Sequence, residues 1–154
     1  MERTPVFDDS AALTAEKESW ARGLSLRNTI DGAPCAHGAP VAVVNPATGM
    51  PFAEVAGAGK ADLDRAFSAA SISFGQWRHT PWADRTALLR KFADAVAADE
   101  EALATLVTLE QGRPLAFARA EVRRNAEAIR QMAQLVVQPA VLKDDDRSHA
   151  VLHY

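Results

Sequence analysis

Apolar and polar residues follow two different periods along this chain, and the change falls near residue 60. Before that point, short apolar segments are separated by turn residues, a pattern typical of β-strands. Asp31 and Gly32 indicate a hairpin turn, and Asn45–Gly49 indicates a second turn in which glycine accepts a positive φ angle. The predicted strands cover residues 26–31, 41–44 and 52–55.

From residue 60 onward, apolar side chains recur every three or four residues, as expected for amphipathic helices. The first predicted helix starts near Lys60, where Ser, Thr or Asp would cap better, and ends at Gly75–Trp77. Thr80 is the predicted N-cap of the second helix, with Pro81 as its first residue. The apolar faces of these two helices comprise Leu63, Ala66, Phe67, Ala70 and Phe74, and Leu88, Leu89, Phe92, Ala95 and Val96.

Two further helices are predicted between Asp99 and Pro139. Asp99 is the expected N-cap of the first, and Gly112 is its expected end. Pro114 is expected to begin the second, and Pro139 to stop it because proline lacks the N–H that a helix interior needs. Their apolar faces comprise Leu103, Leu106 and Val107, and Leu115, Ala118, Val122, Ile129, Met132 and Val136.

The two ends of the chain carry weaker or different patterns. Residues 1–25 are predicted to form a loosely docked N-terminal arm, and the alternative is a short helix capped by Ser10 that ends at Gly23. At the other end, residues 140–142 and 150–152 are apolar and flank a polar stretch. This pattern predicts a hairpin with a charged tip.

Composition narrows the possible functions of the 154-residue chain, which is the size of one domain. The net charge of -3 creates no strong field to attract nucleic acid or an anionic membrane, so neither partner is expected. No apolar run approaches the roughly 20 residues that span a bilayer. The N-terminus has no apolar signal segment, and the single cysteine fits a reducing compartment, so we expect a cytoplasmic protein.

Several motifs in the middle of the chain resemble one enzyme family. They are the turn Asn45–Gly49, then Trp77 followed by Arg85 and residues 88–90, and finally Thr108–Leu115. The last motif, TLEQGRPL, is the most specific, although it has Arg113 where the family more often has lysine. In this order and at these spacings, residues 26–154 resemble the N-terminal portion of an NAD(P)-dependent aldehyde dehydrogenase.

The resemblance implies an α/β fold with a doubly wound sheet for the whole enzyme. This chain alone is expected to be mostly helical, with short N-terminal strands and a C-terminal hairpin. Residues 26–137 would supply a strand pair and helices that pack on the cofactor-binding domain. Residues 138–154 would be the start of an oligomerisation hairpin, truncated here, through which the chain forms a homo-oligomer or pairs with the rest of an aldehyde dehydrogenase.

The resemblance also implies a reaction. In the family, a cysteine thiolate attacks the aldehyde, hydride passes to NAD or NADP, and water activated by a glutamate hydrolyses the thioester. These groups lie beyond the position that matches Tyr154. No cofactor is therefore expected on this chain, which is predicted to be inactive alone. The alternative is a non-catalytic helical module that pairs with a full-length aldehyde dehydrogenase.

Four groups of residues are candidate sites, and none is predicted to be catalytic, cofactor-binding or metal-ligating. Cys35 and His37 can lie about 7 Å apart on one face of a strand, but nothing orients the histidine and the family's cysteine context is absent. His149 and His153 on a strand stand about 13 Å apart, too far to share an ion, although helical spacing would suit zinc. Both pairs are interpreted as residues without a catalytic or metal role.

The remaining two groups lie on the predicted helices. Glu110, Gln111 and Gly112 are interpreted as structural, because Gly112 ends one helix just before Pro114 begins the next. The fourth group is an arginine cluster interleaved with acids. A nucleic-acid surface would be more basic, so we predict a solvated, ion-paired face, with contact to the rest of the enzyme as the alternative. This group comprises Arg119, Arg123, Arg124 and Arg130, with Glu121 and Glu127.

Overall fold

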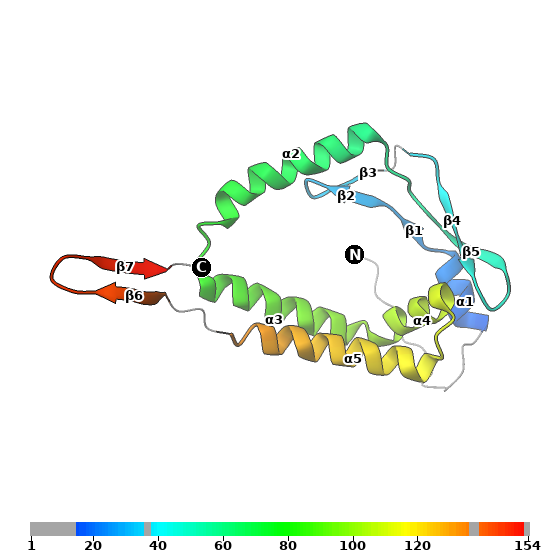
Figure 1. The fold of residues 1–154 in the computed structure, drawn as a ribbon. Coiled ribbons are helices and arrows are strands. Elements are labelled where there is room, and N and C mark those ends of the chain that lie inside the picture. Colours follow the sequence, from blue (N-terminus) through cyan, green and yellow to red (C-terminus); the bar gives the residue numbers. More distant parts are fainter. Residues whose placement is uncertain (1–14, 36–37, 136–138, 153–154) are drawn as a thin grey trace.

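The computed structural model describes residues 15–35, 38–135 and 139–152. Within these ranges a small three-stranded sheet and a helical layer lie side by side, and two hairpins extend from them (Figure 1). The sheet has the order β1 (Ser25–Leu26), β5 (Met50–Val55), β4 (Val41–Asn45). Strand β1 runs parallel to β5, and β4 runs antiparallel to it, with Val41 opposite Val55.

The hairpin predicted at Asp31–Gly32 is confirmed, but its first strand is shorter than expected. Strands β2 (Asn28–Ile30) and β3 (Ala33–Cys35) form a separate two-stranded sheet, so the strand predicted over residues 26–31 is divided between two sheets. Asp31 and Gly32 have φ angles of 53° and 71°, the double positive φ of a tight hairpin turn. The division falls beside Asn28, whose side-chain amide donates to the carbonyls of Ala56 and Gly57 at 3.0 and 3.2 Å.

Four of the helices lie where the period predicts them: α2 (Lys60–Trp77), α3 (Trp82–Ala98), α4 (Glu100–Gln111) and α5 (Leu115–Met132). Two predicted starts are wrong by one residue, because Pro81 and Pro114 are N-caps with extended ψ angles of 145° and 136° rather than first helical residues. Helix α2 is capped by Asp62, whose carboxylate accepts the Gly59 N–H at 3.0 Å. This bond offsets the absence of a capping side chain before Lys60.

Helix α5 stops at Met132, so the prediction that it continues to Pro139 is wrong. Side chains of α3 bind the backbone carbonyls just beyond its end. Arg90 Nη2 donates to Ala133 O at 3.1 Å, and Trp82 Nε1 donates to Leu135 O at 2.9 Å. The carbonyls that α5 leaves open are thus satisfied by α3 instead of by further helical turns. Val136, predicted on the apolar face of α5, lies outside the described residues.

The described part of the N-terminal segment is a docked helix and not a loose arm. Helix α1 (Ala15–Arg22) buries Lys17 and Ala21 completely. Its end follows the alternative prediction, because the Gly23 N–H closes the last turn onto Trp20 O at 3.1 Å. Ser10, the predicted N-cap, lies outside the described residues.

Two small clusters of buried side chains form the core. The first joins α1, the sheet and α4 through Ala21, Phe52, Ala53 and Leu109. The second lies between α4 and α5 and consists of Ala104, Leu115, Ala118 and Val122. Alanine supplies much of both clusters, so each buries little apolar area per residue.

The apolar faces predicted for α2 and α3 are largely uncovered. Phe67 and Phe74 on α2 are 76% and 59% exposed, and Phe92 on α3 is 57% exposed. Helix α3 contacts α5 and buries Thr86 and Ala93; from its predicted apolar face, Val96 packs against the second core cluster, while Phe92 stays exposed. Fully burying one such aromatic side chain contributes about 1.5–3 kcal/mol, so these faces favour a covering partner.

The predicted C-terminal hairpin is confirmed by β6 (Ala140–Asp144) and β7 (His149–Leu152), which pair antiparallel with Val141 opposite Val151. The hairpin extends away from the end of the helix pair at which α3 begins and α5 ends (Figure 1). Asp145 orders the charged tip, because its carboxylate accepts the Ser148 N–H at 2.8 Å.

Gly112 and Gly49 provide a matched pair of substitutions. Both have a φ angle of about 70°, but a Cβ atom at Gly112 would lie 3.0 Å from Pro46 Cγ, whereas one at Gly49 would meet open space. We predict that Gly49→Ala lowers the free energy of unfolding by about 1 kcal/mol and Gly112→Ala by about 2 kcal/mol. Urea unfolding followed by circular dichroism checks this, and equal losses would show that the Pro46 contact has no energetic effect.

Candidate functional site

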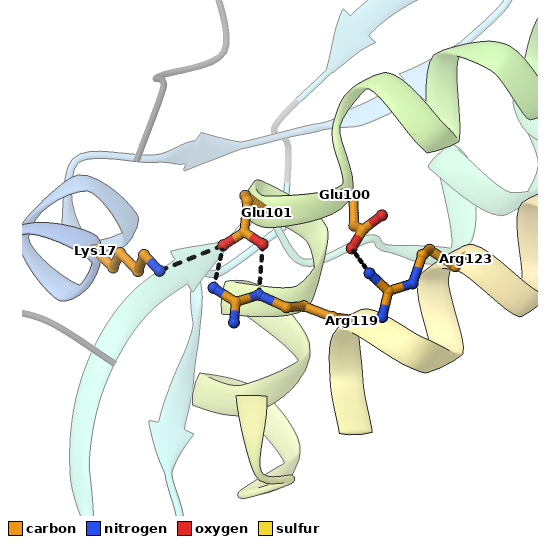
Figure 2. Close-up of polar contacts among 5 residues, drawn as sticks. All are labelled: Lys17, Glu100, Glu101, Arg119 and Arg123. Carbon is orange, nitrogen blue, oxygen red and sulfur yellow. Dashed lines mark hydrogen bonds and ion pairs between the residues drawn. The ribbon is translucent and has the colours of Figure 1, made fainter. Parts of the chain in front are cut away.

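The most organised polar feature of the described residues is a charge cluster where α1, α4 and α5 meet (Figure 2). Local sequence places its members. Glu100 and Glu101 occupy the first turn of α4, where the helix dipole favours acids. Arg119 and Arg123 are four residues apart on α5, and this spacing puts them on one face of the helix. The packing of α4 against α5 then brings acids and bases together.

Glu101 is the centre of the cluster. Its carboxylate accepts two hydrogen bonds from Arg119, from Nε to Oε1 at 2.5 Å and from Nη2 to Oε2 at 2.8 Å. Bidentate pairing of this kind combines charge with fixed geometry. The same Oε2 atom also accepts from Lys17 Nζ at 3.3 Å. One carboxylate thus joins three helices (Figure 2).

Burial makes this arrangement energetically important. The side chains of Lys17, Arg119 and Glu101 are 1%, 12% and 27% exposed. A charge that is taken out of water is costly unless it is paired. The pKa of Glu101 is lowered, and hydrogen bonding from Arg119 is the largest cause. Desolvation raises this pKa, whereas the positive charges of Arg119 and Lys17 lower it further. The carboxylate therefore stays ionised over the neutral range and compensates both buried cations.

Further ion pairs surround the centre. Arg123 pairs with Glu100 at 3.0 Å, and Arg113 with Glu121 at 2.9 Å. Arg130 pairs with Asp94 of α3 at 2.9 Å. Arg130 also lies 3.8 Å from Glu127, and Arg124 is exposed.

The prediction of an ion-paired face is thus confirmed for Arg119, Arg123 and Arg130. The prediction that this face is solvated holds only in part. Arg119 is largely buried and not solvated. Sequence reasoning missed Lys17 and Glu101 as its partners. The acidic first turn of α4 was a signal for Glu101, whereas no local pattern marked Lys17, because its partner is 84 residues away. The cluster holds helices together, and its paired arginines present no open anion site.

The other predicted groups are dispersed. Cys35 is buried at the end of β3, and its predicted companion His37 lies outside the described residues. His149 is exposed, with Nδ1 at 3.0 Å from Asp144 Oδ1, and His153 lies outside the described residues. In the part of the chain that the structure describes, no group of three or more His, Cys, Asp and Glu residues could hold a metal ion.

The motif at residues 110–112 forms the corner between α4 and α5. Glu110 and Gln111 have exposed side chains. Gly112 adopts the left-handed conformation, and its N–H donates to Thr108 O at 2.9 Å, which ends α4. In the described ranges, no helix is long and apolar enough to cross a membrane.

Comparison with known proteins decides the family. Residues 34–150 match the sequence profile of the aldehyde dehydrogenase family. The chain belongs to the aldehyde dehydrogenase family. The resemblance drawn from Asn45–Gly49 and Thr108–Leu115 is therefore confirmed. Helix α1 and strands β1 and β2 lie outside the matched range.

Individual relatives agree with this assignment. A malonate-semialdehyde dehydrogenase of Halalkalibacterium halodurans is 40% identical over 111 residues, which are 71% of this chain and 23% of the relative. The crystal structure of betaine aldehyde dehydrogenase from Staphylococcus aureus in complex with NAD+ superposes with a TM-score of 0.78 and 26% identity, covering 84% of this chain and 27% of that one. An aldehyde dehydrogenase from Brucella melitensis biovar abortus gives a TM-score of 0.68 at 30% identity, covering 72% of this chain and 23% of that one.

The chain thus spans about a quarter of the length of these relatives. The described elements, mostly helices with short strands, form part of the family's α/β fold, as the resemblance implied.

The lowered pKa of Glu101 determines how the stability of the fold should change with pH. Because this pKa lies below the unfolded value of about 4.3, the stabilisation is complete above that pH and is lost as the pH falls through the folded pKa. We predict that Glu101→Gln lowers the free energy of unfolding by about 3 kcal/mol at neutral pH, since it removes a negative charge that contacts two buried cations. The deficit relative to wild type should shrink in acid below about pH 4.

Glu100→Gln provides the control for this prediction. Glu100 lies next to Glu101 in the chain but pairs with Arg123, which is 61% exposed. Its substitution should cost about 0.5 kcal/mol, as expected for a surface ion pair. Urea titrations from neutral to acid pH measure both variants. Equal losses, or a deficit for Glu101→Gln that persists in acid, would contradict the assigned role.

Proposed function

We propose that the protein to which this chain belongs oxidises an aldehyde to a carboxylic acid with NAD+ or NADP+. The observation that carries the proposal is the family match over residues 34–150. Its curated relatives include malonate-semialdehyde dehydrogenases, and a similar solved structure holds NAD+. A short aldehyde that bears a carboxylate is therefore the first substrate to test, with NAD+ as the first cofactor. A cytoplasmic location is part of the proposal, supported by the single cysteine.

Within that enzyme, residues 26–137 are proposed to act as a structural part that packs on the cofactor-binding domain. The uncovered apolar faces of α2 and α3 support this role. Phe67, Phe74 and Phe92 would contribute hydrophobic stabilisation once a partner covers them. The only cysteine, Cys35, is buried in the β2–β3 hairpin and has no base placed to activate it among the described residues. The nucleophile and the dinucleotide site are accordingly assigned to other parts of the enzyme.

The test compares the natural protein from its own cells with the isolated 154-residue chain. The natural protein should reduce NAD+ or NADP+ when malonate semialdehyde or another short aldehyde is added. The isolated chain should show neither turnover nor heat of NAD+ binding by calorimetry. Turnover by the isolated chain would contradict the structural role, and a natural protein that is inactive with a broad aldehyde panel would contradict the proposed reaction.

A second candidate is a non-catalytic interaction module that pairs with a full-length aldehyde dehydrogenase or with itself. The β6–β7 hairpin favours it. Val141, Leu142 and Leu152 are exposed on this hairpin, and a two-stranded ribbon is marginally stable alone in water. Residues 138–154 would then be the pairing segment. This candidate requires a soluble, folded 154-residue product whose association is abolished when the hairpin is removed.

A further inference from the structure

The motif of Trp77 followed by Arg85 lies at the corner between α2 and α3. Helix α2 ends at Trp77 and helix α3 begins at Trp82, and the two helices diverge from the corner between them (Figure 1). Helix α2 packs against β2, whereas α3 packs against α5. Because the two helices pack on different elements, contacts at the corner contribute directly to their relative direction.

Arg85 of α3 spans this corner. Its guanidinium donates from Nε to Thr80 O at 2.8 Å and from Nη2 to Arg78 O at 2.9 Å. The central carbon of the guanidinium also lies 5.6 Å from the centroid of the Trp77 ring, within reach of a cation–π interaction. One side chain of α3 thus contacts the last residue of α2 and two carbonyls that follow it.

The helix dipoles explain why a cation is useful at this place. Arg85 lies in the first turn of α3, where that helix's own dipole disfavours a cation. The last turn of α2 contains no basic residue, although a cation there is favoured. Carbonyls at a helix end also need donors from outside the helix. Arg85 therefore serves the end of α2 rather than the start of α3.

The two helices that meet at this corner both carry exposed apolar side chains. Phe74 near the end of α2 and Leu88 near the start of α3 are 59% and 49% exposed. A partner that covers both faces has to meet them at one angle. Ordering a flexible corner at the moment of binding costs free energy, and a corner that is fixed beforehand avoids this cost.

We propose that Arg85 is a positioning residue that fixes the angle between α2 and α3, so that their apolar faces meet a covering partner as one preformed surface. The proposal rests on the proposed function only for the partner, which is the rest of the enzyme. Its test measures the corner in the chain by itself and needs neither turnover nor a cofactor. Failure of this proposal is therefore distinguishable from failure of the proposed function.

The distance between two spin labels on the complete 154-residue chain tests the positioning. Ser71→Cys on α2 and Lys91→Cys on α3, both at exposed positions, carry the labels in a Cys35→Ala background. Arg85→Met keeps an apolar stem but removes both donors, so it should broaden the distance distribution. Arg90→Met is the matched control, because Arg90 lies on the same helix but donates to a carbonyl beyond α5, and it should leave the distribution unchanged.

Amide hydrogen exchange in the same two variants locates the change. The N–H groups of residues 78–80 donate to carbonyls of the last turn of α2, and the N–H of Ala133 donates to a carbonyl of α5. Arg85→Met should accelerate exchange at residues 78–80 about tenfold, the scale expected for losing a hydrogen bond from a charged group, and should spare Ala133. Arg90→Met should spare residues 78–80.

Two results would overturn the proposal. A distance distribution for Arg85→Met as narrow as that of the unsubstituted chain would show that other groups fix the angle. Equal acceleration of exchange at residues 78–80 and at Ala133 would show that the whole chain opens together. If Arg85→Met does not fold, Arg85→Lys decides the matter, because lysine keeps the charge but lacks the planar fork of donors. That variant should still broaden the distribution, and an unchanged distribution would refute the role of the fork.

Discussion

The left-handed turn at Gly112 is the constraint on which the rest of the structure depends. It folds α5 back onto α4, and this packing forms the second core cluster and brings Arg119 to Glu101. The same glycine lies against Pro46 in the turn that joins β4 to β5. One contact between the helical layer and the sheet is therefore made by a residue without a side chain. The two motifs that resemble the family most, Asn45–Gly49 and Thr108–Leu115, are the two sides of that contact.

Local chemistry made much of the fold predictable. Positive φ angles at Gly49 and Gly112, the hairpin turn at Asp31–Gly32 and the helical periods all follow from residues close together in sequence. The helix starts at Pro81 and Pro114 were wrong by one residue, and the larger errors arose where distant residues contribute. Helix α5 ends early because Arg90 and Trp82, more than forty residues away, bind the carbonyls beyond it.

The candidate site was likewise predictable where nearby residues decide its structure and unpredictable where distant residues do. The arginines of α5 were visible as an ion-paired face, because their spacing and the neighbouring acids lie within one helix. The role of Lys17 was not visible, because a lysine in a weakly patterned segment gives no sign that it is buried against Glu101. The docking of α1 was missed for the same reason. Long-range ion pairs cannot be derived from periodicity, which reports only the face on which a residue lies.

The distribution of apolar surface connects the structure to the family. Alanine supplies half of the buried residues of the two core clusters, while phenylalanines of α2 and α3 remain exposed. A partner that covers these exposed phenylalanines would stabilise the chain further. The relatives, about four times as long, contain the additional chain that can provide such cover.

The proposed function treats this chain as the structural N-terminal part of a larger aldehyde dehydrogenase. The most direct test is the mass of the natural protein in its own cells, detected with an antibody against residues 60–135. The account predicts a single species several-fold heavier than the 16.5 kDa of this chain. A stable species at 16.5 kDa, with no heavier one, would contradict it.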